Sequence, residues 1–426
     1  MKLAVIGSVS TYTPELIEGL IQNREALKVT ELFLMDIDRN KLTIVGELVV
    51  RMIAKAGLPC SVTMTENLDE ALVGASYVLA QIRVGRLPAR ILDEQIPLKY
   101  NLIGQETTGI GGFFKALRTI PVIENIAHRM EALCPDAWLV NFSNPSGILA
   151  DMLLNHTKVK SMGLCNVPIN MVIDIREKLN LPEAQIDYLG LNHLGWVTSI
   201  QDQEKEYIDI ALEKQIAGVT MNNITQSYFD YDVVKMVGAI PCSYLQYYYF
   251  RNSKLKKLLS EEKTRGEQCV EIENELLKLY QDTNLYEKPE ILNSRGGHRY
   301  SLAAISLICA IENDSQERHV VNIKNNGAVP FMDDDDVLEI PAMIGKNGAK
   351  PVTVHNWDNI HIKNMMRIVK AYEKLTIQAA LNGDDNAALN ALMLNPLIGD
   401  FQAAKACYYE LKEAHKQYLP RFYQKA

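Results

Sequence analysis

The stretch MKLAVIGSVSTYTPELIEGL, residues 1–20, decides the fold class. Its first seven residues form a short apolar segment that ends in glycine, and Thr13-Pro14-Glu15 has the composition of a helix start. A strand that leads through a glycine into a helix is typical of the first unit of a parallel α/β sheet. Only Ser8-Val9-Ser10 stands where a dinucleotide-binding protein usually has further glycines. The loop alone is therefore as compatible with an ordinary turn as with a cofactor site.

The rest of the first half alternates strand and helix patterns. Apolar runs such as LAVIG, TELFLMDID, SYVLAQIRVG and AWLVNFS are separated by amphipathic segments such as KLTIVGELVVRMIAKAG. Such runs predict parallel strands buried on both faces, and therefore a doubly wound, Rossmann-like α/β sheet. After about residue 165 long helical patterns such as RGEQCVEIENELLKLY dominate, while AAISLICAIEND carries only a weak strand or turn signal. We predict a Rossmann-like domain over 1–165 and a mostly helical α+β domain over 166–426.

Composition argues against several functional classes. Lys and Arg number 44 against 52 Asp and Glu, a formal charge of -8, so bulk charge does not favour a nucleic-acid partner. No apolar run has the length of a membrane span, and the segment before Gly7 is too short for a secretion signal, so we expect a cytoplasmic protein. The 7 cysteines are odd in number and form no CxxC pair, which favours reduced thiols over disulfides or structural zinc.

An acidic residue supports a nucleotide site. Asp36 ends the second predicted strand, where a carboxylate can bind the ribose hydroxyls and repel a 2′-phosphate. This position favours NAD over NADP. If the first loop binds the pyrophosphate at the helix N-terminus, the cofactor site would contain Gly7, Ser8, Ser10, Thr11 and Asp36.

Polar segments follow several later strands. The stretch RVGRLPARILDEQIPLKYNLIGQETTGIGGFFKALRTIPV, residues 83–122, is dense in glycine, arginine and carboxylates, and NFSNPSG, residues 141–147, ends another strand with two amides. GLCNVPIN places Cys165 after a further strand, and LGLNHLGW places His193 in an apolar setting. Ligands bind at the carboxyl ends of parallel strands, so these segments indicate one ligand-binding edge.

Together these segments resemble glycoside hydrolase family four, the NAD- and manganese-dependent 6-phosphoglycosidases, over nearly the whole chain. The shared features are the 83–122 block, the SNP segment, the cysteine followed by N.P, and the NH pair. Asn166 after Cys165, and IPCSYLQYYYF over 240–250, are similar to the β-glucosidase branch, because the α-specific branch has aspartate after the cysteine. The opening loop departs from the family, which usually has GGGSSYTPEL where this chain has GSVSTYTPEL.

The resemblance implies a reaction centre. Cys165 and His193 would bind the metal, Tyr244 would be the general base, and Glu106 would support it by raising its basicity. From the residues alone, Tyr244 lies in an aromatic run that could instead pack in the core, and Tyr248 is the next candidate for the base.

The resemblance also implies a substrate site. Arg90, Asn144 and Arg265 would bind the phosphorylated sugar, since arginine binds phosphate through two parallel donors. Each has a structural alternative. Arg90 could pair with Asp93 or Glu94, Asn144 could serve the turn, and Arg265 could be a solvated charge at a helix end.

The implied reaction is a redox-assisted elimination. NAD would take hydride from C3 of the sugar, Tyr244 would take the C2 proton, the aglycone would leave C1, and water and the hydride would then be added. We therefore expect a 6-phospho-β-glucosidase for sugars such as cellobiose 6-phosphate, acting as a homodimer or homotetramer. The alternatives are an NAD-dependent dehydrogenase of the lactate and malate type, an enzyme of the same family specific for α-linked or other hexoses, and a non-catalytic sugar-phosphate sensor.

Overall fold

The computed structural model describes residues 1–216, 229–295 and 300–424, and these contain one 13-stranded sheet. Its first part is parallel and has the order β3-β2-β1-β4-β5-β6. The strands are β1 (Lys2–Ile6), β2 (Glu31–Met35), β3 (Ser61–Thr65), β4 (Tyr77–Ala80), β5 (Trp138–Asn141) and β6 (Lys160–Gly163). This is the doubly wound order, in which ligands bind where the order reverses, between β1 and β4. The predicted fold class is confirmed.

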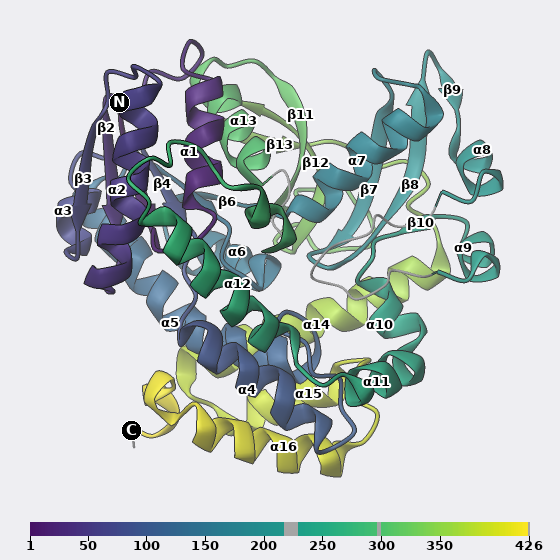
Figure 1. Cartoon of the computed structure of the whole chain (residues 1–426). Coiled ribbons are helices and arrows are strands. Elements are labelled where there is room, and N and C mark those ends of the chain that lie inside the picture. The colour runs from purple at the N-terminus through teal and green to yellow at the C-terminus, as the bar shows by residue number, and fades with distance from the viewer. Residues whose placement is uncertain (217–228, 296–299, 425–426) are drawn as a thin grey trace.

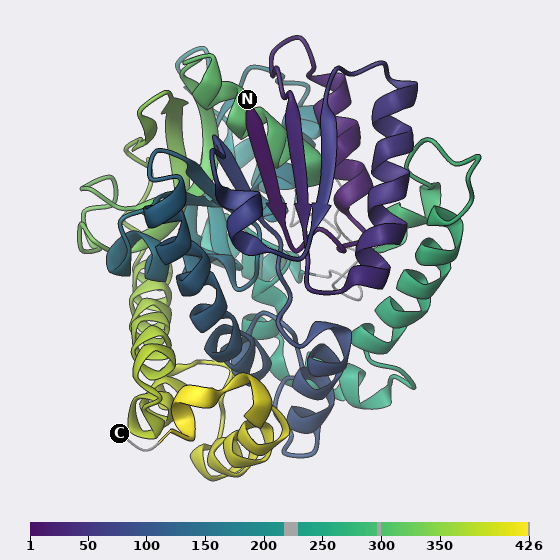
Figure 2. The same ribbon diagram turned by 90° about the vertical axis from the view of Figure 1, so that its left-hand side faces the viewer.

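Helices cover both faces of the parallel strands, as right-handed crossovers require. Figure 2 shows α1 and α2 lying against one face. The helices of this half are α1 (Thr13–Gln22), α2 (Arg39–Lys55), α3 (Leu68–Leu72), α4 (Arg86–Leu98), α5 (Gly109–Leu133) and α6 (Ser146–His156). As the sequence predicts, α1 begins at Thr13 with proline in its first turn, where the missing N–H costs nothing.

The second part of the sheet is antiparallel and continues from β6. Its order is β6-β11-β12-β7-β8-β10, with β13 on β12 and β9 on β8 (Figure 1). These strands are β7 (Gln185–Leu191), β8 (Leu194–Asp202), β9 (Lys205–Glu206), β10 (Ile240–Pro241), β11 (Glu317–Lys324), β12 (Val337–Gly345) and β13 (Gly348–Pro351). The division at residue 165 stays a prediction. The parallel strands end at β6, but the hydrogen-bonded ladder runs on into β11.

Helices make up most of the remaining chain. They are α7 (Asn166–Leu179), α8 (Ile208–Glu213), α9 (Tyr231–Val237), α10 (Leu245–Tyr249), α11 (Arg251–Ser260), α12 (Arg265–Tyr280), α13 (Tyr300–Glu312), α14 (Ile360–Asn382), α15 (Asp385–Leu394) and α16 (Phe401–Ala414), with short 3-10 turns at Glu290–Arg295, Lys416–Tyr418 and Pro420–Phe422. The predicted helix RGEQCVEIENELLKLY coincides with α12, whose start has a capping box of Thr264 and Glu267.

One prediction is wrong. The segment AAISLICAIEND does not form a strand or turn, because most of it belongs to helix α13. Residues such as Ala304 and Ile308 are buried, and α13 packs against both α1 and β12. A helix that is apolar on every side has no polar face to mark its period, so its pattern cannot be distinguished from that of a buried strand.

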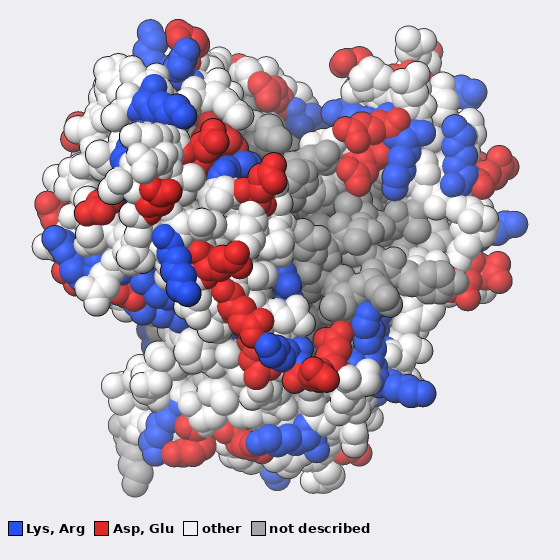
Figure 3. Space-filling model, viewed as in Figure 1, with Lys and Arg blue, Asp and Glu red and all other residues white. Residues whose placement is uncertain are grey.

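The C-terminal helices form a separate layer, which lies below the sheet in the view of Figure 1. Helices α14 and α16 pack on α5 and α4, with Phe114 and Tyr408 rings 5.5 Å apart between centroids. No helix in the described ranges combines the length and apolar character needed to cross a membrane. On the face shown in Figure 3, basic and acidic side chains are interspersed.

Candidate active site

The loop between β1 and α1 is fixed by its backbone. Gly7 has a φ of +86°, and a Cβ placed there would lie 2.9 Å from the carbonyl of Gln81, so only glycine fits. The N–H groups of Gly7 and Ser8 donate to the carbonyl of Met35 at 3.0 and 3.1 Å. These bonds hold the loop against the end of β2, which brings it next to Asp36.

The predicted nucleotide-binding residues lie together. Asp36 is buried and accepts hydrogen bonds from Val9 N at 3.4 Å and Asp38 N at 3.1 Å. Burial raises the pKa of Asp36, and these backbone donors oppose the rise. The hydroxyls of Ser8 and Thr11 are buried without a hydrogen-bond partner in the ranges that the structure describes. Two orphaned hydroxyls at the N-terminal end of α1 fit a site for nucleotide oxygens.

Glu106 lies between α4 and α5 at the centre of a buried charge cluster. Its carboxylate contacts Arg83, Arg90 at 3.0 Å and Lys115 at 2.9 Å. Burial alone would raise the pKa of Glu106, but these three cations outweigh it and hold the pKa well below the usual value. Burial, reinforced by the charge of Arg83, lowers the pKa of Lys115 to about 7. Glu106 is thus the shared partner of three basic side chains, of which Arg90 and Lys115 are buried.

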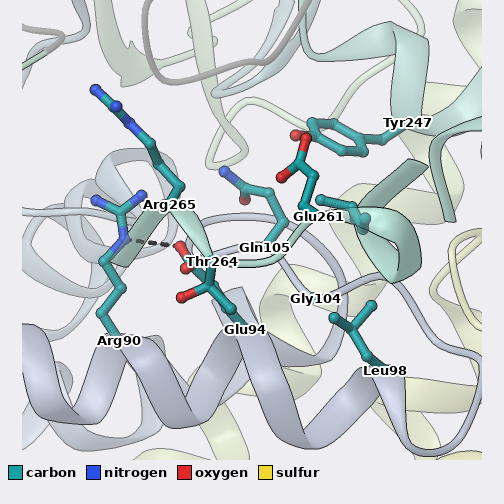
Figure 4. Close-up of a pocket in the computed structure, with 10 residues that line it drawn as sticks. Arg90, Glu94, Leu98, Gly104, Gln105, Tyr247, Glu261, Thr264 and Arg265 are labelled. Atoms are coloured by element: carbon teal, nitrogen blue, oxygen red, sulfur yellow. Dashed lines mark hydrogen bonds and ion pairs between the residues drawn. The ribbon is translucent and has the colours of Figure 1, made fainter. Parts of the chain in front are cut away.

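Arg90 and Arg265 line one pocket (Figure 4). Arg90 is buried and pairs with Glu94 at 2.7 Å, as well as with Glu106. Arg265 begins α12 and donates to Gln268 Oε1 at 3.1 Å and to Ser294 O at 2.8 Å. The structure thus brings both predicted phosphate-binding arginines to one pocket, but Arg90 is also the partner of two buried carboxylates.

Asn144 lies at the carboxyl end of β5, just before α6. It is half-buried and precedes Pro145 through a cis peptide bond. The neighbouring Ser143 accepts a hydrogen bond from Ile82 N at 2.9 Å, which ties the ends of β4 and β5 together. Asn144 therefore lies at the carboxyl edge of the parallel sheet, next to the end of β4.

Cys165, His193 and Tyr244 come from three separate segments and meet in the interior. Cys165 caps α7, His193 forms the turn between β7 and β8, and Tyr244 precedes α10. The His193 and Tyr244 rings are stacked, with centroids 3.8 Å apart. Burial raises the pKa of Tyr244 well above its usual value, and the charges of Cys165 and Glu106 add to the rise. The Tyr244 phenol therefore lies against His193 and within electrostatic range of Cys165 and Glu106.

The alternative base does not share these neighbours. The pKa of Tyr248 is raised by burial and by Tyr372 and Glu373, which belong to α14. Tyr248 thus faces the C-terminal helices, whereas Tyr244 faces Cys165 and His193.

The Cys165 and His193 pair fits a metal. Burial lowers the pKa of His193 to about 3, so the ring is in the neutral form that binds metals, and its Nδ1 has no hydrogen-bond partner among the described residues. Burial and Glu339 raise the pKa of Cys165 well above its usual value, an effect that a bound cation would reverse. In the described ranges no group of three or more His, Cys, Asp or Glu side chains is arranged to hold a metal. A metal here would need further ligands of another kind, such as water or substrate oxygens.

Two members of the charge cluster were not predicted as site residues. Arg83 and Lys115 lie within the 83–122 block, yet no spacing rule connects either residue with Glu106. Both could have been predicted from the segment itself, because Arg83, Arg90 and Lys115 lie in a stretch whose apolar flanks predict burial. Buried cations are almost always paired with a carboxylate.

Comparison with known proteins identifies the family. The family model "Family 4 glycosyl hydrolase" matches residues 2–181, and that of the "Family 4 glycosyl hydrolase C-terminal domain" matches residues 188–398. The chain belongs to glycosyl hydrolase family 4. It is 41% identical to the probable 6-phospho-beta-glucosidase of Bacillus subtilis over 436 residues, which cover 100% of this chain and 98% of the relative. The family resemblance predicted from the motifs is confirmed.

One similar solved structure is that of the 6-phospho-beta glucosidase from Thermotoga maritima with manganese, NAD+ and glucose-6-phosphate. This chain matches it with a TM-score of 0.89 at 36% identity, covering 98% of this chain and 99% of that one. A relative named for a different linkage, the maltose-6′-phosphate glucosidase of Bacillus subtilis, is 29% identical over 98% of this chain and 96% of its own length.

Proposed function

We propose that this family 4 enzyme hydrolyses 6-phosphorylated β-glucosides, with NAD and a divalent metal such as manganese. The observation that carries the proposal is that His193 stacks on the Tyr244 phenol and that Cys165 is close enough for its charge to raise the pKa of this phenol, in a chain that belongs to family 4. A glucosidase that relies on two carboxylates does not need this set of residues, and family 4 is an exception to that scheme.

The β linkage is supported by the comparisons. Identity to the relative named for β-glucosides is 41%, whereas it is 29% to the one named for maltose 6′-phosphate. Asn166 follows Cys165, as in the β branch that the motifs resemble. A dehydrogenase of the lactate and malate type is the weaker alternative, because the family 4 glycosyl hydrolase models match both halves of the chain.

When bound, NAD would accept and return the C3 hydride, and the metal would polarise the sugar oxygens at C2 and C3 as a Lewis acid. The chain's own groups do the rest. Tyr244 removes the proton from C2, which requires a nearby cation because burial holds the phenol in its neutral form. Glu106 stays ionised among its three cations and orients them. Arg265 and Arg90 bind the phosphate from the pocket that they share.

The test is a turnover assay in deuterated water with p-nitrophenyl β-glucoside 6-phosphate, NAD, manganese and a thiol reductant. We expect nitrophenol release that depends on NAD, with deuterium at C2 of the product. Release without NAD would exclude the hydride step. NADH accumulation on a hydroxy acid without nitrophenol release would favour the dehydrogenase, and binding of the sugar phosphate without turnover would favour the sensor.

We also propose a cytoplasmic location and a homodimer or homotetramer. The cytoplasmic location is supported by the seven cysteines, which are all free, and by the phosphorylated substrate, since sugars of this kind arise during uptake. The second is supported by exposed apolar side chains on the C-terminal helices, among them Met393 and Tyr409, which are 61% and 46% exposed. Mass measurement in solution tests it.

A further inference from the structure

A buried polar chain lies behind Cys165 and His193. Asn322 of β11 and Glu339 of β12 face each other across the ladder, and Asn322 Nδ2 donates to Glu339 Oε1 at 3.1 Å. Asn192 Nδ2 donates to the same oxygen, also at 3.1 Å. Glu339 is 0% exposed and Asn322 1% exposed. Burying a carboxylate costs free energy even when two amides donate to one of its oxygens, so its presence here indicates a specific role.

The two ends of this chain reach the two predicted metal ligands. Asn322 Nδ2 also donates to the carbonyl of Gly163 at 3.3 Å, and Gly163 lies two residues before Cys165. Asn192 directly precedes His193, and its amide forms a hydrogen bond with Cys165 that lowers the pKa of the thiol. Glu339 therefore lies between the segment that carries Cys165 and the turn that carries His193.

Sheet topology makes such a connection necessary. The strand that leads to Cys165, β6, and the strand that leads to His193, β7, are not neighbours, because β11 and β12 lie between them. The register pairs at these junctions are Asn322 with Gly163 and Glu339 with Gly190. The same two side chains that stand at the junctions thus form the polar chain. The distance between Cys165 and His193 therefore depends on the positions of β11 and β12 relative to β6 and β7.

We propose that Glu339 is a positioning residue that fixes the placement of Cys165 relative to His193 through Asn322 and Asn192. The inference rests on the proposed metal site. Metal ligands need to be placed within a few tenths of an ångström, and the groups hydrogen-bonded behind them set that placement. Helix α6 supports the arrangement from the other side, since a Cβ at Gly147 would lie 2.8 Å from Cβ of Asn192.

The test compares Glu339→Leu with Glu339→Gln in the full chain with NAD bound. Leucine removes both acceptor oxygens, whereas glutamine keeps one that can still accept from both amides. Mn²⁺ affinity is measured by electron paramagnetic resonance of the free ion, and the ligand geometry by the cobalt–thiolate absorption of the Co²⁺ form. We expect Glu339→Leu to weaken Mn²⁺ binding about 10- to 100-fold and to change the cobalt spectrum, and Glu339→Gln to stay within about tenfold.

A second substitution and a control separate positioning from general destabilisation. Asn322→Ala breaks the link to Gly163 but leaves the carboxylate in place, and it should weaken Mn²⁺ binding in the same direction, which keeps the test open if Glu339→Leu does not fold. Leu48→Ala opens the buried core of α2 and should lower thermal stability without changing Mn²⁺ affinity. A folded Glu339→Leu or Asn322→Ala protein with the affinity and cobalt spectrum of the wild type would overturn the inference. A wild-type protein with no cobalt–thiolate band would instead overturn the metal site itself.

Discussion

The imidazole of His193 lies flat on the phenol ring of Tyr244, with centroids 3.8 Å apart and planes within 10°. The contact places the proposed base directly against a proposed metal ligand. A cation held by His193 would therefore be close to the phenol, and it would oppose the effects of burial and of Cys165 and Glu106 that raise the pKa of Tyr244. The stacking explains how a tyrosine so deeply buried could act as a base.

Tyr244→Phe should abolish most turnover but keep the fold. Phenylalanine preserves the ring that stacks on His193 and removes only the hydroxyl, so we expect kcat to fall about 10²- to 10⁴-fold with little change in Mn²⁺ affinity. Steady-state assays and deuterium incorporation at C2 measure this. Tyr248→Phe is the matched control and should remain active. Full activity of Tyr244→Phe would remove the residue from the mechanism.

Cys165→Ser should weaken metal binding selectively. A serine hydroxyl is a poorer ligand than a thiolate, so we expect Mn²⁺ affinity to fall by at least about tenfold while NAD affinity is unchanged. Titration calorimetry measures both affinities. Cys242→Ser is the control, because Cys242 is another buried thiol and lies close enough to Cys165 for its charge to raise the pKa of that thiol. Equal loss in the two variants would contradict the assignment.

Substitution of the two pocket arginines should have different effects on substrate binding and on stability. Arg265→Met should raise KM for the phosphorylated substrate about 10- to 100-fold, since a hydrogen bond to a charged group contributes about 1.5–3 kcal/mol. Arg90→Met should also lower the free energy of unfolding by about 3–5 kcal/mol, because it leaves Glu94 and Glu106 buried with one cation fewer. Urea unfolding and substrate kinetics on both variants check this. A purely kinetic effect of Arg90→Met would show that its ion pairs are dispensable.

Asp36→Ser should change the choice of nucleotide. Loss of the carboxylate removes an acceptor for the ribose hydroxyls, so NAD affinity should fall about tenfold or more. It also removes a charge that repels a 2′-phosphate, so the ratio of NAD affinity to NADP affinity should fall. Binding titrations with both nucleotides measure the ratio. An unchanged ratio would place the ribose elsewhere.

The charge of Glu106 should make stability depend on pH in one direction. Its pKa in the folded protein lies below the ordinary value of 4.5, so the stability gained from its charge is present above about pH 4.5 and is lost as the pH falls toward the folded-state value. Glu106→Gln leaves Arg83, Arg90 and Lys115 without their shared counter-charge, and at neutral pH it should cost about 3–5 kcal/mol. Unfolding free energies across pH should converge for the two proteins in acid. A constant difference would show that the charge is not the cause.

Local sequence patterns were sufficient where structure depends on local properties. The strands β1, β2, β4 and β5 and the helices α1 and α12 are predicted correctly, because continuous apolar runs and helix caps report burial and helix ends within a few residues. The strand β3 was not predicted. The helix α13 was missed because it is apolar on all sides, and periodicity carries no information in that case.

The sequence by itself determined the fold class and the family, since these follow from apolar runs and motifs that lie close together in the chain. The residues that it assigned to a nucleotide, a metal and a phosphate stay predictions. Only the tertiary structure decided which of them meet. In the structure, β11 and β12 lie between the strands that lead to Cys165 and His193. Tyr244 stacks on His193, and three cations surround Glu106. The physical reason is that burial, charge pairing and stacking depend on contacts between residues far apart in the chain, and no local pattern records them.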